Sequence, residues 1–285
     1  MKRRILNLTL LIMLFVSVSF LHAQDDELLK KARTEMSNSN YADAVKLLTQ
    51  GLEAKKDAHY YFERGTCYYF LKENDKAIRD FTSAIEVNPD YAEAYNRRGK
   101  INMDMQNNDA ALSDFNKAID LRKDYADPHY NKGLLDHTNK NFDAALQDYT
   151  NALTIKPNFA EAYYNRGLVN FELEKYDAAV EDYTRAIEIK SEYGKGYFNR
   201  GNAYLRLKKY TEAIGDFSKA IDLNTELIVS YSNRGQAYYS NEDYKNAVDD
   251  WNAALKLNKE TDMKTKLMTF IKDAENKMKE KKDNK

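Results

Sequence analysis

The chain alternates short amphipathic segments, in which apolar residues recur every three or four positions, with polar turns of a few residues. In residues 160–176, Ala162, Tyr163, Leu168 and Phe171 stand at helical spacing. Residues 177–190 repeat the pattern with Ala179, Val180, Tyr183, Ala186, Ile187 and Ile189. This spacing predicts two helices, each with one buried face, joined as a hairpin.

The same pattern returns every 34 residues along most of the chain. Glycine follows this period at Gly65, Gly99, Gly133, Gly167, Gly201 and Gly235, and alanine follows it at Ala77, Ala111, Ala145, Ala179, Ala213 and Ala247. A large aromatic side chain does so at Phe81, Phe115, Tyr149, Tyr183, Phe217 and Trp251. A period of this length indicates an array of small units, each of which buries its apolar face against its neighbours.

The repeated positions, numbered from the first residue of each unit, resemble the signature of the tetratricopeptide repeat family. Position 4 is aromatic at Tyr61, Tyr95, Tyr163, Tyr197 and Tyr231, with His129 as the exception, and position 27 is Ala84, Ala118, Ala152, Ala186, Ala220 and Ala254. The resemblance implies an all-α fold, a right-handed superhelical solenoid of about seven helix hairpins plus a C-terminal capping helix. It also implies a concave groove lined by the first helix of each unit.

We place the array at residues 25–261, followed by a capping helix over 262–280 and a disordered tail over 281–285. The units are residues 25–57, 58–91, 92–125, 126–159, 160–193, 194–227 and 228–261, of which the first is weaker and one residue short. The capping helix carries one apolar stripe, which we expect to cover the open face of the last unit.

Residues 1–23 do not belong to the array. Basic residues precede an apolar run from Ile5 to Leu21, and Ala23 ends the segment. This order is typical of a secretory signal peptide, so we expect an exported bacterial protein, periplasmic or secreted. A retained membrane anchor is the alternative, because the run approaches the length of a spanning helix. Four polar residues within the run favour cleavage, after which no insertion into the membrane is expected.

Charge and cysteine content narrow the classes of function. Without residues 1–23, the chain has 41 Lys and Arg against 45 Asp and Glu, with no basic block. A mildly acidic chain of this kind is a poor nucleic-acid binder, so no nucleic-acid partner is expected. Cys67 is the only cysteine. It lies in an apolar helical segment, so we interpret it as a small buried side chain and not as a reactive thiol.

The strongest candidate site is a row of amides at position 6 with aromatic neighbours. Asparagine both donates and accepts hydrogen bonds, so such a row can hold a peptide backbone without reading its sequence. We assign partner binding to the amides Asn131, Asn165, Asn199 and Asn233, to Tyr130, Tyr164 and Phe198 at position 5, and to His137, Phe171 and Tyr239 at position 12. The alternative is that asparagine at this position only caps or solvates its own helix.

The family's clamp for C-terminal carboxylates is not carried over to this chain. It needs a set of Lys, Asn and Arg residues in three consecutive units, and no three units here supply that set. Position 6 is asparagine, not arginine, in the last four units. The resemblance therefore implies protein binding without implying that particular ligand.

A second recurrence pairs opposite charges. Position 7 is basic at Arg64, Arg98, Lys132, Arg166, Arg200 and Arg234, and position 23 is acidic at Asp80, Asp114, Asp148, Asp182, Asp216 and Asp250. Because both positions change together, we predict an ion pair between the two helices of each unit or between neighbouring units. This pairing concerns stability.

Nothing in the sequence supports catalysis. His59, His129 and His137 are the histidines after the leader, and none has a second ligand at metal spacing,. No glycine-rich phosphate loop is present, so no cofactor and no metal are expected. We therefore predict a non-enzymatic interaction scaffold that binds an extended partner segment in the groove. The alternatives are a structural subunit of an envelope assembly or secretion complex, and a carbohydrate-binding accessory protein.

Overall fold

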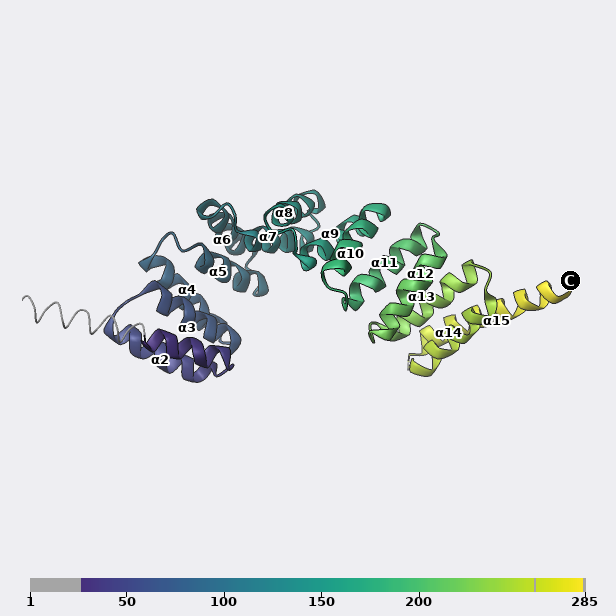
Figure 1. The fold of residues 1–285 in the computed structure, drawn as a ribbon, viewed down its shortest axis with the longest axis horizontal. Helices are drawn as coiled ribbons and strands as arrows, with labels where there is room; N and C mark the ends of the chain where they lie inside the picture. Colours follow the sequence, from purple (N-terminus) through teal and green to yellow (C-terminus); the bar gives the residue numbers. More distant parts are fainter. Residues whose placement is uncertain (1–26, 259, 284–285) are drawn as a thin grey trace, which may run out of the picture. The chain divides into compact units, whose positions relative to one another are not determined.

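The structure is a computed structural model that describes residues 27–258 and 260–283. Within these residues all regular structure is helical (Figure 1), so the predicted all-α array of helix hairpins is confirmed. The predicted signal peptide lies outside the described residues. No helix in the described part is long and apolar enough to cross a membrane. The described residues form two compact units, one ending at Asn131 and the other beginning at Lys132.

The first compact unit is a succession of antiparallel helices, in which each helix packs against the next. Residues 27–37 are helical, and this helix precedes α2 (Tyr41–Ala54), α3 (Ala58–Phe70), α4 (Asn74–Val87), α5 (Ala92–Asp104) and α6 (Asn108–Leu121). The helix α7 (Ala126–Thr138) begins in this unit and ends in the second.

The second compact unit consists of further helix hairpins of the same kind. It contains α8 (Phe142–Ile155), α9 (Ala160–Glu172), α10 (Tyr176–Ile189), α11 (Gly194–Arg206), α12 (Tyr210–Asp222), α13 (Leu227–Ser240), α14 (Tyr244–Leu257) and α15 (Thr261–Asp283). The helices α9, α11 and α13 are the first helices of successive repeats, and α11 contacts both α9 and α13. Their neighbouring faces therefore form one surface.

The recurring glycines and aromatics meet inside each hairpin. A methyl group added at Gly167 would lie 2.7 Å from the ring of Tyr183, and at Gly201 it would lie 2.9 Å from the ring of Phe217. The position-24 aromatics are almost fully buried, as are the alanines at positions 20 and 27. Glycine thus leaves room for a large ring, and the alanines let the helices approach closely.

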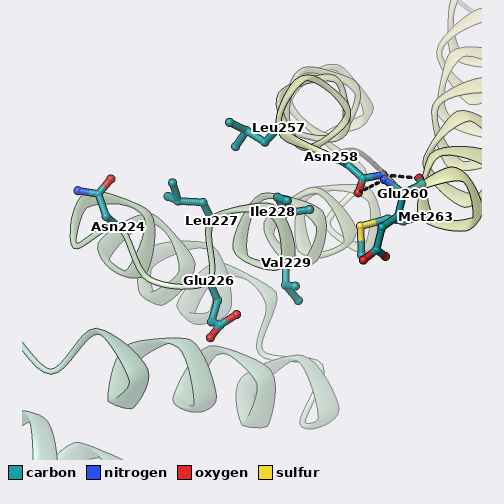
Figure 2. Close-up of a pocket in the computed structure, with 9 residues that line it drawn as sticks. All are labelled: Asn224, Glu226, Leu227, Ile228, Val229, Leu257, Asn258, Glu260 and Met263. Carbon is teal, nitrogen blue, oxygen red and sulfur yellow. Dashed lines mark hydrogen bonds between the residues drawn. The ribbon is translucent and has the colours of Figure 1, made fainter.

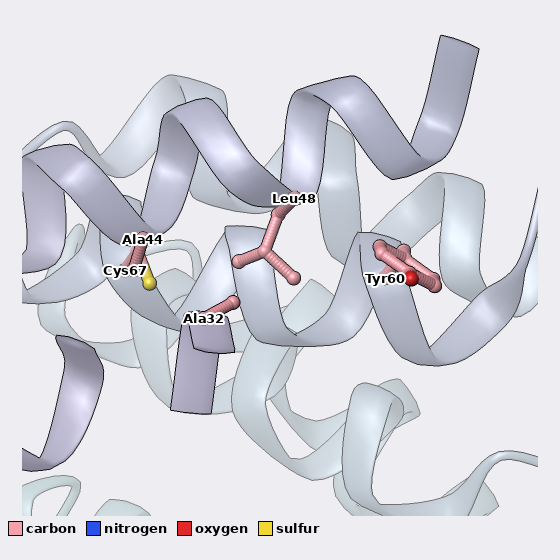
Figure 3. Close-up of a cluster of buried hydrophobic side chains, with 5 residues drawn as sticks. All are labelled: Ala32, Ala44, Leu48, Tyr60 and Cys67. Atoms are coloured by element: carbon pink, nitrogen blue, oxygen red, sulfur yellow. The ribbon is translucent and has the colours of Figure 1, made fainter. Parts of the chain in front are cut away.

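The weaker first repeat shares a small core with α3 of the second repeat. Ala32, Ala44, Leu48, Tyr60 and Cys67 are buried together (Figure 3). Cys67 has no exposed surface, and burial raises the pKa of its thiol to about 12. The interpretation of Cys67 as a buried, unreactive side chain is consistent with this environment.

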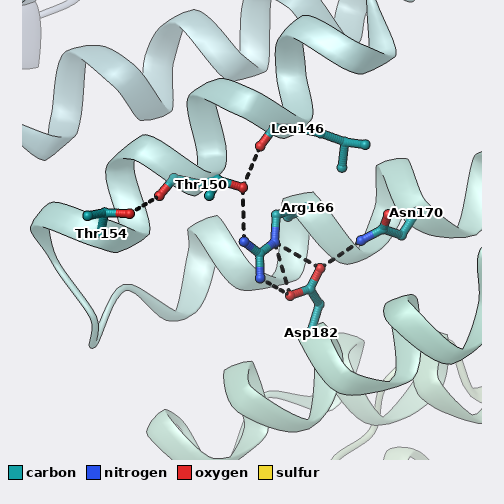
Figure 4. A network of polar contacts seen from close by, with 6 residues as sticks. All are labelled: Leu146, Thr150, Thr154, Arg166, Asn170 and Asp182. Carbon is teal, nitrogen blue, oxygen red and sulfur yellow. Dashed lines mark hydrogen bonds and ion pairs between the residues drawn. The ribbon is translucent and has the colours of Figure 1, made fainter.

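The predicted ion pairs between positions 7 and 23 are present within each of the six repeats of residues 58–261. In the repeat of α9 and α10, the Arg166 guanidinium binds Asp182, whose second oxygen also accepts from Asn170 (Figure 4). Arg166 Nη1 donates in addition to Thr150 Oγ1 of α8, in the preceding repeat, at 3.0 Å. Each such arginine therefore joins its own hairpin and ties it to the one before.

The final helix covers the last hairpin, as expected of a cap. Leu267 and Ala274 are buried against Trp251 and its neighbours. The helix is longer than the predicted 262–280, since α15 includes residues 281–283, where the sequence suggested a disordered tail. Near this end, Lys281 Nζ lies 2.8 Å from Glu242 Oε2, an exposed ion pair that links α15 to the turn before α14.

One connection between repeats differs from the others. The helix α12 ends at Asp222, at position 29 of its unit, whereas α10 ends at Ile189, at position 30. Asn224 and Glu226 then adopt positive φ angles of 52° and 45° before α13 begins. The remaining non-glycine residues with positive φ in the described part lie in turns between the two helices of a hairpin. The α12–α13 connection is therefore the irregular one.

Candidate functional site

Most of the predicted binding residues lie on the surface shared by α9, α11 and α13, and we call this surface the α9–α11–α13 face. We define it by Tyr164, Asn165, Asn199, Asn202 and Asn233. All five side chains are half-buried. They come from neighbouring helices, so the repeat places one polar group beside the next along the face.

Asn199 is held by the preceding repeat. Its Nδ2 donates to the Tyr164 hydroxyl at 2.9 Å. The Tyr164 ring packs against Tyr183 and Tyr193, with centroids 5.9 and 5.0 Å away. Burial raises the pKa of Tyr164, the Asn199 hydrogen bond opposes this, and the charge of Glu226 adds to it. The tyrosine therefore stays neutral and serves as a fixed acceptor that orients the amide.

Asn233 is oriented by a different neighbour. Its Nδ2 donates to Asn202 Oδ1 of α11 at 2.8 Å. Asn165 donates instead to the Glu161 carbonyl of its own helix at 2.9 Å. Two amides of this face, Asn199 and Asn233, are thus held by an adjacent repeat, and Asn165 bonds to its own helix.

Asn131 does not continue the row as an accessible group. It is only 6% exposed, and its Nδ2 donates to Asn96 Oδ1 at 2.9 Å. Asn96 in turn donates to the Tyr125 hydroxyl at 3.1 Å. Asn131 and Tyr130 also belong to the first compact unit, apart from the other predicted residues. The prediction that Asn131 lines an open binding surface is therefore corrected: it is part of a buried polar network between repeats.

The predicted aromatic neighbours form a half-buried band. Phe198 packs edge-on against Phe217 at 6.0 Å, and Phe171 against Tyr176 at 5.3 Å. Tyr164, Leu168 and Phe171 together border the buried core of their repeat. These side chains consequently have one surface in the core and another that stays available, which suits contact with a ligand side chain.

The remaining two predicted residues make polar contacts between elements. His137 Nε2 lies 2.9 Å from Glu172 Oε1, and Tyr239 donates to Asp273 of α15. The hydrogen bond with Asp273 is the main cause that raises the pKa of Tyr239 to about 12. Within the described chain, no three His, Cys, Asp or Glu side chains are arranged to hold a metal ion.

Sequence reasoning missed the partners that orient the amides. Asn96 stands at position 5, where later repeats carry Tyr130, Tyr164 and Phe198, and Asn202 stands at position 9, where the preceding repeat has Leu168. For Asn96 the polar residue itself was the available signal, because position 5 is aromatic in the repeats on both sides. Position 9 gave no such signal for Asn202, since the following repeat also has a polar residue there, Gln236. The pairing itself spans 31 to 35 residues and becomes visible only once the helices are packed.

Comparison with known proteins agrees with the repeat. Profiles of the tetratricopeptide repeat match residues 58–91, 92–125, 160–193, 194–226 and 228–260, and a TPR repeat profile matches residues 136–174. The chain belongs to the tetratricopeptide repeat family. Repeats of this family support a protein–protein interaction scaffold, a class of protein that is generally non-catalytic,.

Individual relatives share the repeat over different lengths. The chain is 32% identical over 76 residues to Small glutamine-rich tetratricopeptide repeat-containing protein 2 of Saccharomyces cerevisiae, which covers 26% of this chain and 22% of that protein. The C-terminal part of a TPR repeat-containing protein from Cytophaga hutchinsonii has a TM-score of 0.69 at 21% identity, over 85% of this chain and 99% of that one. YrrB, described as a TPR protein with an unusual peptide-binding site, has a TM-score of 0.61 at 21% identity, over 66% of this chain and 97% of its own. The two solved structures show a shared fold.

Proposed function

We propose that this tetratricopeptide repeat protein is a non-enzymatic scaffold that holds an extended segment of a partner protein across the α9–α11–α13 face. The observation that carries the proposal is the tethering of Asn199 and Asn233, each by one amide N–H to a neighbouring repeat. Within the described residues, neither side chain makes another hydrogen bond. Each therefore presents a carbonyl oxygen and a second N–H in a fixed orientation.

Such groups suit the backbone of an extended chain. A peptide unit offers one N–H and one C=O, and an oriented amide can satisfy both at once. Fixing the amide in advance reduces the entropy lost on binding. The band of Tyr164, Phe171 and Phe198 beside the amides can receive apolar side chains of the same segment. This combination supports a peptide as the ligand better than a charged small molecule.

The compartment belongs to the same proposal. The basic, apolar and small-residue order of residues 1–23 supports export, and the partner would then be a protein of the bacterial envelope or its surroundings,. In a chain with one cysteine, no intramolecular disulfide can form, so packing and the Arg–Asp pairs must supply stability there,.

The test uses the full chain without residues 1–23 and a random dodecapeptide phage library as the probe. Peptides selected on the unmodified protein are synthesised, and their affinity is measured by fluorescence polarisation for Asn199→Ala/Asn233→Ala. Because each lost hydrogen bond costs ~0.5–1.5 kcal/mol, the double variant should bind about tenfold more weakly. The matched control is Asn151→Ala/Asn252→Ala, which removes two amides from α8 and α14, the second helices of their repeats.

Equal affinity of the selected peptides for the double variant and the unmodified protein would show that the amides are not the site. A glycan array run in parallel separates the peptide proposal from carbohydrate binding. Glycans that bind the unmodified protein and no longer bind Asn199→Ala/Asn233→Ala would replace the peptide as the ligand class.

A further inference from the structure

A small hollow lies between α3 and α5 in the first compact unit, apart from the amides of the α9–α11–α13 face. It is lined by Thr66 and Tyr69 of α3, Phe81 of α4, and Arg97, Lys100 and Ile101 of α5. Its volume of about 10 Å³ is close to the least that holds one water molecule,. The hollow therefore has room for a single oxygen atom of a ligand, and the rest of that ligand must lie on the surface.

Cations gather around this hollow. Arg97 and Lys100 stand three residues apart on α5, so their side chains are neighbours on one face of the helix,. The ammonium groups of Lys72 and Lys100 each lie 5.9 Å from the centroid of the Tyr69 ring. Two cations therefore flank this ring, and the Arg97 side chain lines the same hollow as the ring does.

Few acidic groups oppose these cations. Arg97 forms no ion pair among the described residues, and Lys100 Nζ lies 3.9 Å from the Asp104 carboxylate, farther than a hydrogen bond. Glu63 of α3 is bound instead by Arg33 at 2.8 Å. No acidic residue lines the hollow. An anionic group at this place can therefore accept charge-assisted hydrogen bonds without repulsion from the lining.

The two cations of α5 are not part of the repeat pattern. In the later repeats positions 6 and 9 are neutral, with the pairs Asn131 and Leu134, Asn165 and Leu168, Asn199 and Asn202, and Asn233 and Gln236. Those repeats form the same hairpins without a charge at either position. A hollow of about 500 Å³ beside the α12–α13 connection, drawn in Figure 2, has Glu226 and Glu260 among its lining residues and no described cation. Arg97 and Lys100 thus give α5 a charge that the packing of the repeat does not require.

An exposed aromatic ring lies beside the cations. Phe70 follows Tyr69, with the two ring centroids 5.7 Å apart, and it is 48% exposed. It stacks on Tyr41 of α2 at 4.7 Å, with an angle of 11° between the rings. In the later repeats position 13 is polar, at Asp104, Thr138, Glu172, Arg206 and Ser240. The surface beside the hollow can therefore receive an apolar side chain.

We propose that this surface of α3 and α5 is a second docking site, which receives an acidic side chain beside an apolar one in an extended segment of a partner protein. One carboxylate oxygen enters the hollow and accepts hydrogen bonds from Arg97 and Lys100, and the apolar neighbour packs on Phe70. The ligand is a side chain within a segment and not a chain terminus, and both cations belong to one repeat. The site lies in the other compact unit from the amides Asn199 and Asn233 and does not depend on them.

The test is a nuclear magnetic resonance titration of the full chain without residues 1–23. The probes are acetyl-Leu-Glu-Leu-amide, its neutral counterpart acetyl-Leu-Gln-Leu-amide, acetyl-Ala-Glu-Ala-amide and inorganic phosphate. The first should shift the backbone amides of Tyr69, Arg97 and Lys100. It should bind about two- to fivefold more tightly than the glutamine peptide, the range set by an exposed ion pair, and about 0.5 M sodium chloride should remove this preference. The alanine peptide should bind more weakly than the first, because it has no large apolar side chain to pack on Phe70.

One double variant tests the cations and has a matched control. Arg97→Asn/Lys100→Leu installs the pair that the next repeat carries at positions 6 and 9. It should keep its helical circular dichroism and lose the preference for the glutamate peptide over the glutamine peptide. The control, Arg79→Asn/Lys117→Leu, makes the same two exchanges at exposed places on the second helices α4 and α6, and it should keep that preference.

Phe70→Thr tests the aromatic ring, because a later repeat carries threonine at the same position, Thr138. This variant should bind the leucine and alanine forms of the glutamate peptide equally. Asn199→Ala/Asn233→Ala leaves α3 and α5 intact and should respond as the unmodified protein does. Failure of this docking site is therefore distinguishable from failure of the proposed amide row.

Equal affinity for the glutamate and glutamine peptides would overturn the proposal, and so would a preference retained in Arg97→Asn/Lys100→Leu. If inorganic phosphate shifted the same amides and bound as tightly as the glutamate peptide, the site would be one for free anions and the proposal would be wrong. A tighter response to acetyl-Leu-Gln-Leu with a free C-terminal carboxylate would assign the site to a chain terminus and overturn it as well.

Discussion

Arg166 and Asp182 form a multiply hydrogen-bonded ion pair between the two helices of one hairpin. Arg166 Nη2 lies 2.6 Å from Asp182 Oδ1, and Nε lies 3.1 Å from both carboxylate oxygens. The Asp182 carboxylate is 3% exposed and accepts a further bond from Asn170 at 2.9 Å. Asp182 is therefore shielded from solvent, and Figure 4 shows the bonds that Arg166 and Asn170 make to it.

Removal of one partner of this pair should cost more than removal of both. Asp182→Ala leaves the Arg166 guanidinium without its counter-charge in a largely buried place, and we expect a loss of about 3 kcal/mol. Arg166→Leu/Asp182→Ala removes both charges and should lose less. Urea denaturation followed by circular dichroism measures the difference. Equal loss in the two variants would contradict a buried pair.

An exposed pair provides the control for that comparison. Arg185 and Glu188 lie 2.6 Å apart on the surface of α10, with both side chains more than half exposed. An exposed pair contributes ~0–1 kcal/mol, so Glu188→Ala should change the urea midpoint little. A large effect of this substitution would indicate that charge removal on α10 destabilises the hairpin for another reason.

Mild acid should favour the native state through Asp182 and Asp216. Burial raises the pKa of both carboxyls, in spite of the opposing arginine hydrogen bonds. The native state therefore binds their protons more tightly than the unfolded chain does. This contribution to stability is fully present below the ordinary pKa of 3.8 and is lost as pH rises through the folded-state value,. The unmodified protein should gain stability relative to Asp182→Asn as pH falls from 7 towards 4.

The contribution of Asp120 to stability should depend on pH in the opposite direction, so Asp120 serves as the control. A hydrogen bond from Lys123 lowers the pKa of this exposed carboxyl. Its contribution is present above the ordinary pKa and is lost as pH falls through the folded-state value. The unmodified protein should therefore lose stability relative to Asp120→Asn on acidification at low salt. If the Asp182→Asn comparison followed the same direction, burial would not dominate at Asp182.

Replacement of two different glycines by alanine should change the free energy of unfolding in opposite directions. At Gly235 the new methyl group would lie 2.7 Å from Nε1 of Trp251, which is buried and donates to the Ser232 carbonyl at 3.0 Å. Overpacking of this kind costs about 1–3 kcal/mol. Gly215 on α12 has no atom within 4 Å of the added methyl, and alanine there should stabilise the helix by about 0.5–1 kcal/mol,. Urea denaturation followed by the emission of Trp251, the single tryptophan, measures both changes.

The repeat period was sufficient to predict the hairpins because the same few contacts recur in each one. A glycine at position 8 faces an aromatic at position 24, and a basic residue at position 7 faces an aspartate at position 23, so local spacing determines the packing. Asp177 lies inside the first turn of α10, and Lys175 is the residue that precedes the helix, so Asp177 complements the helix dipole without capping the end,.

The binding surface was harder to predict because its properties depend on contacts between repeats. The spacing placed Asn131 and Asn199 in equivalent positions, yet Asn96 buries the first and Tyr164 orients the second. Such differences between repeats acquire meaning only after the helices have been packed against each other.

Cys67 should be inert in the native protein. Its side chain has no exposed surface and packs with Ala44 and Leu48, and burial, with a smaller effect from Glu63, raises the pKa of the thiol to about 12. At pH 8 the thiolate fraction is therefore far below that of an ordinary cysteine, and the reagent cannot reach the sulfur. The reaction with dithionitrobenzoate should be slow in buffer and fast in denaturing urea. In a Cys67→Ala background, Asn252→Cys places a thiol on the surface of α14 and should react at once in both conditions. Fast labelling of Cys67 in buffer would mean that the first hairpins open readily, and that the small core around Leu48 does not hold them closed.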